Sequence, residues 1–294
     1  PRWLGRDFWL EREHLGFFER YVEEVSVRLN ALLADRHSMD PVRYWITVNE
    51  PNGLAFITYA LGAFPHGKRG ISRAYTALNN LIEAHCLSYD ALHRIYRDNS
   101  WGAPSVTYNT ISVSIYGADK IITDLLNARR NGVERSELPE YLEQGKAAWD
   151  AEVSRSPAVV KASPLGRGAE RLIAEGFRRT STAERFSGAA DAIYRSEFPD
   201  KLDLLAVDFY DPFLRNMVKA PGFRDIREKR FNFNAEHWEW TLNPVAMYHF
   251  LKAETVNGEG LPLLIAENGM AHKAYRGRVE QRRDGATLGV FLRS

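Results

Sequence analysis

Two short stretches of the sequence place a glutamate beside an asparagine directly after an apolar run. The first is WITVNEP, which contains Asn49 and Glu50, and the second is LPLLIAENGM, which contains Glu267 and Asn268. Carboxyl groups suit proton transfer and nucleophilic attack, because one can be held protonated while a neighbour stays ionised. Glu50 and Glu267 are therefore the candidate catalytic residues.

Two carboxyl groups facing each other across a pocket suit the hydrolysis of a glycosidic bond. The protonated one gives its proton to the leaving-group oxygen, and the ionised one attacks the anomeric carbon or activates water. The negative charge of the second also disfavours ionisation of the first. From the residues alone a simpler interpretation stays open, in which each glutamate caps a helix or solvates a loop and Asn268-Gly269 forms an ordinary turn.

The elements that must position these residues alternate between strands and helices. Apolar runs predict strands over 43–48, 106–109, 204–207 and 261–266, and apolar periodicity predicts helices over 8–34 and 72–97, with a further helix after Pro244. Continuous rather than alternating apolar strands indicate a parallel sheet covered by helices. An open doubly wound sheet and a β/α barrel both fit this pattern. In a barrel, the active site lies where the carboxyl ends of the strands meet.

The composition excludes several other classes of protein. The chain of 294 residues is 45% hydrophobic and carries 39 basic and 38 acidic residues, so no basic surplus suggests a nucleic-acid partner. One cysteine excludes an internal disulfide framework, and the eight histidines show no zinc-ligand spacing. We expect neither metal nor cofactor, and no membrane association. No signal peptide is visible after Pro1, so we expect a cytoplasmic protein.

Several motifs in order resemble family 1 glycoside hydrolases, the β-glucosidase-like enzymes. WITVNEP, followed by GAFPHG, and LPLLIAENGM are similar to the two catalytic segments of that family, T-[FL]-N-E-P and [IV]-T-E-N-G. LDLLAVDFYDP resembles its D-F-[IL]-G-x-N-Y-Y segment, Trp240 to Pro244 its Trp-x-x-x-Pro segment, and PRWLGRDFWLEREHLGFFERYVEEV its Pro-x-Trp-Leu opening and following helix. We expect one domain over 1–294, with a divergent helical insertion at about 115–195, where the resemblance fades.

The resemblance implies a TIM (β/α)8 barrel and hydrolysis of a small β-glucoside-like carbohydrate with retention of configuration. Glu50 matches the general acid/base of the family, and Glu267 matches its nucleophile. Asn49 matches the residue that binds the sugar 2-hydroxyl. Tyr210 matches the hydroxyl that donates to the nucleophile, and Trp240 matches a wall of the substrate cleft.

The sequence also departs from the family pattern. Asp208 stands where the family usually has Asn, and Phe209 where it usually has Tyr. Only strands four to seven of the barrel are recognisable, so we expect an incomplete barrel without its first three strands and its last. The alternative function is a non-catalytic remnant, or a sugar-binding or scaffold protein of the same descent. A nucleotide-binding α/β protein would need a glycine-rich strand-to-helix turn, and none qualifies.

Overall fold

The computed structural model describes residues 7–62, 69–111, 120–155, 182–209, 247–248, 250–252, 254 and 260–268. Its centre is a four-stranded sheet in the order β1-β2-β3-β4, formed by β1 (Tyr44–Asn49), β2 (Ser105–Ile111), β3 (Leu205–Phe209) and β4 (Leu263–Asn268). All three pairings are parallel. The four predicted strands and their parallel arrangement are therefore confirmed, with ends that differ by one or two residues.

Helices lie between successive strands. The described ones are α1 (Leu15–His37), α2 (Pro51–Ala55), α3 (Ile71–Asp98), α4 (Lys120–Asn127), α5 (Leu138–Arg155), α8 (Thr182–Arg185) and α9 (Ser187–Arg195), with a π-helical turn over Phe56–Leu61. Residues of 247–254 that the structure describes are also helical. The chain thus crosses from each strand to its parallel neighbour through helical segments, as parallel strands require.

The first helix begins later than the sequence pattern predicts. Two short 3-10 turns, Phe8–Leu10 and Arg12–His14, precede α1, and the extended backbone of Glu11 separates them. The Arg12 guanidinium donates to both carboxylate oxygens of Glu83 on α3, at 2.7–3.0 Å. This ion pair holds the two 3-10 turns against α3. The apolar residues before Leu15 therefore pack against the core without forming a continuous helix.

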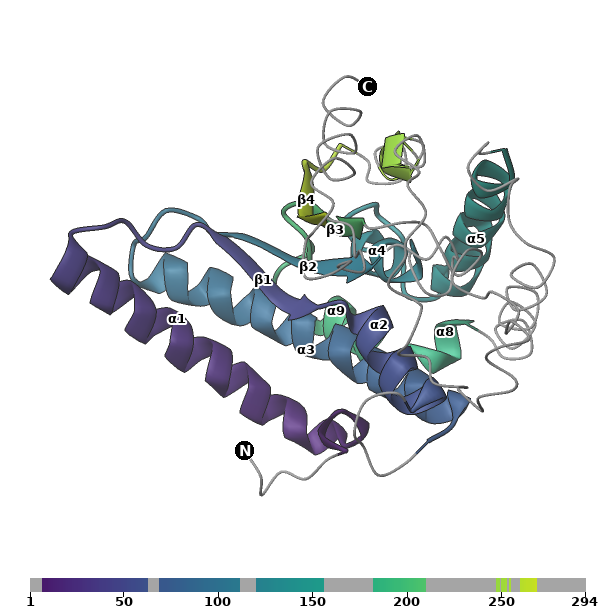
Figure 1. Cartoon of the computed structure of the whole chain (residues 1–294), viewed down its shortest axis with the longest axis horizontal. Helices are drawn as coiled ribbons and strands as arrows, with labels where there is room; N and C mark the ends of the chain where they lie inside the picture. Colours follow the sequence, from purple (N-terminus) through teal and green to yellow (C-terminus); the bar gives the residue numbers. More distant parts are fainter. Residues whose placement is uncertain are drawn as a thin grey trace, which may run out of the picture.

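Helix α3 is the centre of the core. Its apolar side chains Leu78, Leu81 and Leu92 are fully buried, and α1 lies beside it (Figure 1). His85, on the same helix, is 1% exposed and bonds Thr47 of β1 and the backbone oxygen of Lys201. Because burial lowers the pKa of His85 to about 4, this histidine is a neutral core residue that ties α3 to the sheet.

The outer strands carry partly exposed apolar side chains. Ile46 of β1 is 43% exposed and Ile265 of β4 is 40% exposed, whereas every residue of β3 is buried. β1 and β4 each pair with one strand within the described residues, so each keeps one open edge there. Within the same part of the chain, no helix combines the length and the apolar character needed to cross a membrane.

Candidate active site

Glu50 occupies the tight turn between β1 and α2. Its backbone is left-handed, with φ 43° and ψ 56°, and Pro51 follows as the first residue of α2. A glutamate before proline rarely adopts this conformation, and such strain persists only where neighbouring contacts impose it. Here the backbone N–H of Glu50 donates to the backbone oxygen of Asn109 at 3.1 Å, and its backbone oxygen accepts from Leu54 at 2.7 Å. These bonds hold the backbone of Glu50 in this conformation.

A glycine leaves room for the Glu50 carboxylate. A Cβ atom added at Gly53, one turn into α2, would lie 3.3 Å from Oε2 of Glu50 and 3.4 Å from a methyl carbon of Ile111. Both distances are at or below the tight end of ordinary contacts. The absence of a side chain at residue 53 therefore lets the carboxylate settle against the start of α2.

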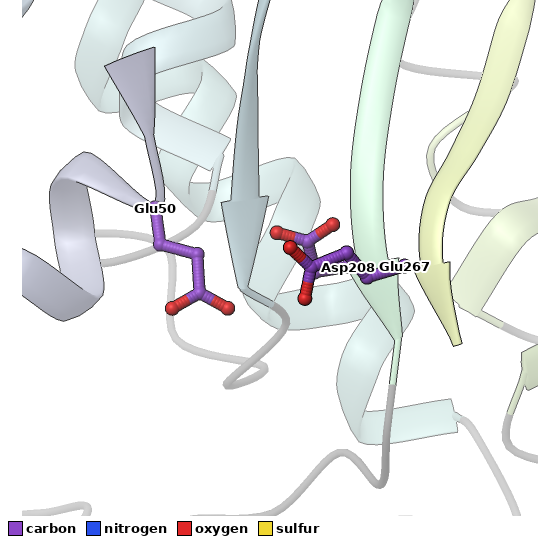
Figure 2. A group of neighbouring side chains, drawn as sticks. All are labelled: Glu50, Asp208 and Glu267. Carbon is purple, nitrogen blue, oxygen red and sulfur yellow. The ribbon is translucent and has the colours of Figure 1, made fainter. Parts of the chain in front are cut away.

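The register of the sheet brings three carboxyl groups together. Asp208 on β3 pairs with Glu267 on β4, and Asn49 at the end of β1 pairs with Asn109 on β2. One carboxylate oxygen each from Glu50, Asp208 and Glu267 lies within 4.8 Å of the other two. Figure 2 shows these side chains converging from the carboxyl ends of their strands. The two glutamates thus share one site, although they lie far apart in the sequence.

Asn109 joins the residues of this site through hydrogen bonds. Its side-chain amide donates to Oδ1 of Asn49 at 2.9 Å and to the carboxylate of Asp208. Its side-chain oxygen accepts from the backbone N–H of Glu50 at 3.3 Å. Because Asn109 is only 1% exposed, these bonds are protected from water and hold the ends of β1 and β3 in a fixed relation.

Burial and mutual repulsion raise the pKa of two of these carboxyl groups toward neutral pH. The pKa of Glu50 rises from 4.5 to about 7, chiefly through burial, then through the charges of Asp208 and Glu267. The pKa of Asp208 rises from 3.8 to about 6 through burial, and the charge of Glu267 adds to the rise, while hydrogen bonds from Asn109 and from the backbone of Glu267 oppose it. A carboxyl group that exchanges its proton near pH 7 can serve as a general acid and as a general base.

The same three oxygens lie close enough to surround a cation. Acidic groups without a bound ion are common, however. The side-chain amide of Asn109 already donates a hydrogen bond to one carboxylate oxygen of Asp208. A hydrogen-bond donor at a carboxylate competes with a metal ion for the same oxygen. Proton chemistry is therefore the better-supported use of the cluster, and the expectation of no metal stays a prediction.

The sequence predictions for the site divide into three groups. The structure brings together Glu50, Glu267 and Asn49 at one edge of the sheet. Tyr210 and Trp240 lie outside the described residues, so their positions stay predictions. Sequence reasoning did not assign Asn109 to the site. The signal for it is an asparagine near the carboxyl end of a predicted strand, the position that also marks Asn49 and Asp208 in theirs.

Part of the sequence matches the model of a known protein family. The family model described as glycosyl hydrolase family 1 matches residues 8–129. The cytosolic β-glucosidase of Homo sapiens is 38% identical over 69 residues, which are 23% of this chain and 15% of that protein. β-Glucosidase A of Thermotoga maritima is 21% identical over 280 residues, which are 91% of this chain and 53% of that protein. The chain thus spans about half the length of the second relative and less of the first.

Comparison with solved structures agrees on the fold. A β-glucosidase from Exiguobacterium marinum superposes with a TM-score of 0.55 at 16% identity, over 100% of this chain and 59% of that one. At this identity the likeness shows the fold alone. It decides between the two architectures: the parallel sheet and its helices form part of a β/α barrel, as predicted. The match of the family model over residues 8–129 confirms the predicted resemblance to glycosyl hydrolase family 1.

Proposed function

We propose that the protein is a retaining β-glycosidase that hydrolyses β-glucoside-like substrates by double displacement. In this proposal Glu50 protonates the leaving-group oxygen and later activates water, while Glu267 attacks the anomeric carbon. The observation that carries it is the close approach of the Glu50 and Glu267 carboxylates, whose oxygens lie within 4.8 Å. Retaining enzymes need a short separation, about 5–5.5 Å between carboxyl groups, whereas inverting enzymes leave room for a water.

The protonation behaviour of Glu50 supports the division of roles. An acid/base residue must hold a proton when the bond to the leaving group breaks and must release it for the second step. The pKa of Glu50, raised to about 7, permits both near neutral pH. Asn49, adjacent to Glu50 and held by Asn109, is proposed to bind the sugar 2-hydroxyl. Tyr210 and Trp240 are proposed to contact the nucleophile and the substrate.

Related structures support a carbohydrate ligand. A T. maritima β-glucosidase in complex with deoxynojirimycin superposes on 97% of this chain with a TM-score of 0.51, at 18% identity. We propose that a small β-glycoside binds in this protein at the carboxyl ends of the strands, beside Glu50 and Glu267. We also propose that residues 1–294 form a single partial barrel domain with a divergent helical insertion at about 115–195.

The alternative is a sugar-binding or scaffold protein that kept the fold without turnover. It is favoured by the open edges of β1 and β4, where Ile46 and Ile265 are partly exposed. A closed barrel has no such edges. A glycosidase turns a bound glycoside over, a sugar-binding protein binds it without turnover, and a scaffold protein need do neither.

One experiment separates the two functions. The chain is incubated with an aryl β-glucoside, release of the phenol is followed by absorbance, and the anomer of the released sugar is read by proton NMR. Calorimetric titration with deoxynojirimycin measures binding in parallel. A retaining glycosidase predicts turnover with the β-anomer formed first. Binding without turnover would favour the sugar-binding alternative, and the α-anomer as first product would contradict the retaining mechanism. Neither binding nor turnover would overturn both the glycosidase and the sugar-binding protein, and would leave a scaffold.

A further inference from the structure

The third carboxyl group of the site, Asp208, is the most buried of the three. Its exposed fraction is 0%, and it lies on β3, an inner strand of the sheet between the strands that carry the other two acids. One of its oxygens accepts from the side-chain amide of Asn109. The other, Oδ1, is buried and has no hydrogen-bond partner of good geometry among the described residues, although the backbone N–H of Glu267 lies near enough to lower the pKa of Asp208. A buried carboxylate oxygen without a well-placed donor carries its charge at a cost, which raises its affinity for a proton.

Three carboxyl groups this close together cannot all ionise independently. At about 4–5 Å, two unit charges still repel by about 1 kcal/mol in water and by several times more at a partly buried site. The carboxylates of Glu50, Asp208 and Glu267 lie within that range of one another. Their protons therefore leave in steps that belong to the group and not to single residues.

We propose that Asp208 is a positioning residue that keeps Glu50 protonated, so that Glu50, Asp208 and Glu267 titrate as one coupled group. The coupling follows from the geometry alone. Its consequence for catalysis, a higher pH at which Glu50 still acts as an acid, rests on the proposed function. In a site with only two carboxyl groups, burial and the charge of Glu267 would have to keep Glu50 protonated without this contribution.

The charges around the two acids agree with the proposal. After burial, the charge of Asp208 contributes most to the raised pKa of Glu50, ahead of the charge of Glu267. The groups that face Asp208 are Glu50 from the end of β1, the uncharged Asn109 from β2 and Glu267 from β4. Among the described residues, no lysine, arginine or histidine contributes to the pKa of Glu50 or Asp208.

Asparagine at position 208 is the substitution that isolates the effect. Its side-chain oxygen can still accept from the amide of Asn109, so the link between β2 and β3 is kept. Only the negative charge and the titrating proton are removed. Since burial is the largest of three causes that together raise the pKa of Glu50 from 4.5 to about 7, Asp208 accounts for less than half of that rise. We expect Asp208→Asn to lower the pKa of Glu50 by up to about one pH unit.

The test is a carbon-13 NMR titration of the side-chain carboxyl groups in the full chain, labelled in Glu and Asp. Three proteins are compared: the natural sequence, Asp208→Asn, and Asp98→Asn as a control. Asp98 ends α3 with a side chain that is 68% exposed, so its removal changes the net charge equally but leaves the site untouched. The proposal requires a lower pKa of Glu50 in Asp208→Asn and no change in Asp98→Asn. An unchanged or raised pKa of Glu50 in Asp208→Asn would overturn it.

A second measurement needs no variant of the site. In the natural sequence the carboxyl resonances of Asp208 and Glu50 should each titrate in more than one step, at shared midpoints. A single step for Asp208 near the ordinary value of about 3.9 would overturn the proposal by itself. Neither measurement depends on turnover. A confirmed coupling in a chain that hydrolyses no glycoside would refute the proposed function and leave the coupling standing, and an active enzyme with an uncoupled Asp208 would do the reverse.

Discussion

Replacing Glu50 by glutamine should stabilise the folded chain at alkaline pH and change little at acid pH. The pKa of Glu50 is raised in the fold from 4.5 to about 7, so folding disfavours its ionised form. Below the unfolded pKa the group is protonated in both states, and it carries no penalty. As pH rises from 4.5 through 7, the unfolded chain ionises first, and the native state loses stability relative to it. Glutamine resembles the protonated acid at every pH and removes this loss.

The expected size follows from the same shift. At about 1.4 kcal/mol per pH unit, a rise from 4.5 to about 7 corresponds to about 3 kcal/mol. Glu50 is only partly buried, so solvent screening reduces the figure, and we expect a gain of about 1–2 kcal/mol at about pH 8. At about pH 5 the gain should fall to a few tenths of a kcal/mol.

The assay is denaturant unfolding followed by circular dichroism at both pH values. Glu24→Gln is the matched control, because its side chain is 63% exposed and pairs only with Arg28 on the same helix. This control should show no gain at alkaline pH. If Glu50→Gln destabilised the chain equally at both pH values, the carboxyl group would be ionised without penalty in the fold, and the acid role derived for it would be refuted.

Three further substitutions test the geometry of the site. Glu267→Ala should abolish turnover of aryl β-glucosides, and azide or formate should restore it with inverted product, because the small anion replaces the nucleophile; unaltered turnover would exclude Glu267 from that role. Gly53→Ala should press on the Glu50 carboxylate and lower kcat about 10–100-fold with unchanged stability, while Gly102→Ala, whose added carbon meets nothing within 4 Å, should leave kcat unaltered; equal effects of the two would refute the crowding. Asn109→Ala should lower the free energy of unfolding by about 1–3 kcal/mol, because Asp208 loses its buried donor, and a denaturant series showing no loss would contradict the role of that hydrogen bond.

The strands and the shared site were predictable because each depends on a strong local signal. Continuous β-branched and apolar runs before Asn49 and Asn268 are typical of strands in a parallel sheet covered by helices. The carboxyl ends of parallel strands point to one edge, so the polar residues that end them must meet.

The role of Asn109 and the coupling of Asp208 could not be predicted, because both depend on register. A shift of one residue turns a strand side chain to the opposite face of the sheet. Irregular pairing between Ile46 and Asn49, and again between Val207 and Asp208, sets which side chains face the site. These irregularities have no signature in a single sequence. The late start of α1 was missed for a similar reason, because the contact of Arg12 with Glu83 is long-range.

The most direct test of the two-carboxylate account is to trap the covalent intermediate. The chain is incubated with an aryl 2-deoxy-2-fluoro-β-glucoside, whose glycosyl-enzyme forms faster than it hydrolyses, and the tryptic peptides are sequenced by mass spectrometry. The account predicts one added fluoroglucosyl group, in the peptide from residues 253–273, attached to Glu267 and absent from a Glu267→Gln control. A label on any other residue, or no label, would contradict it.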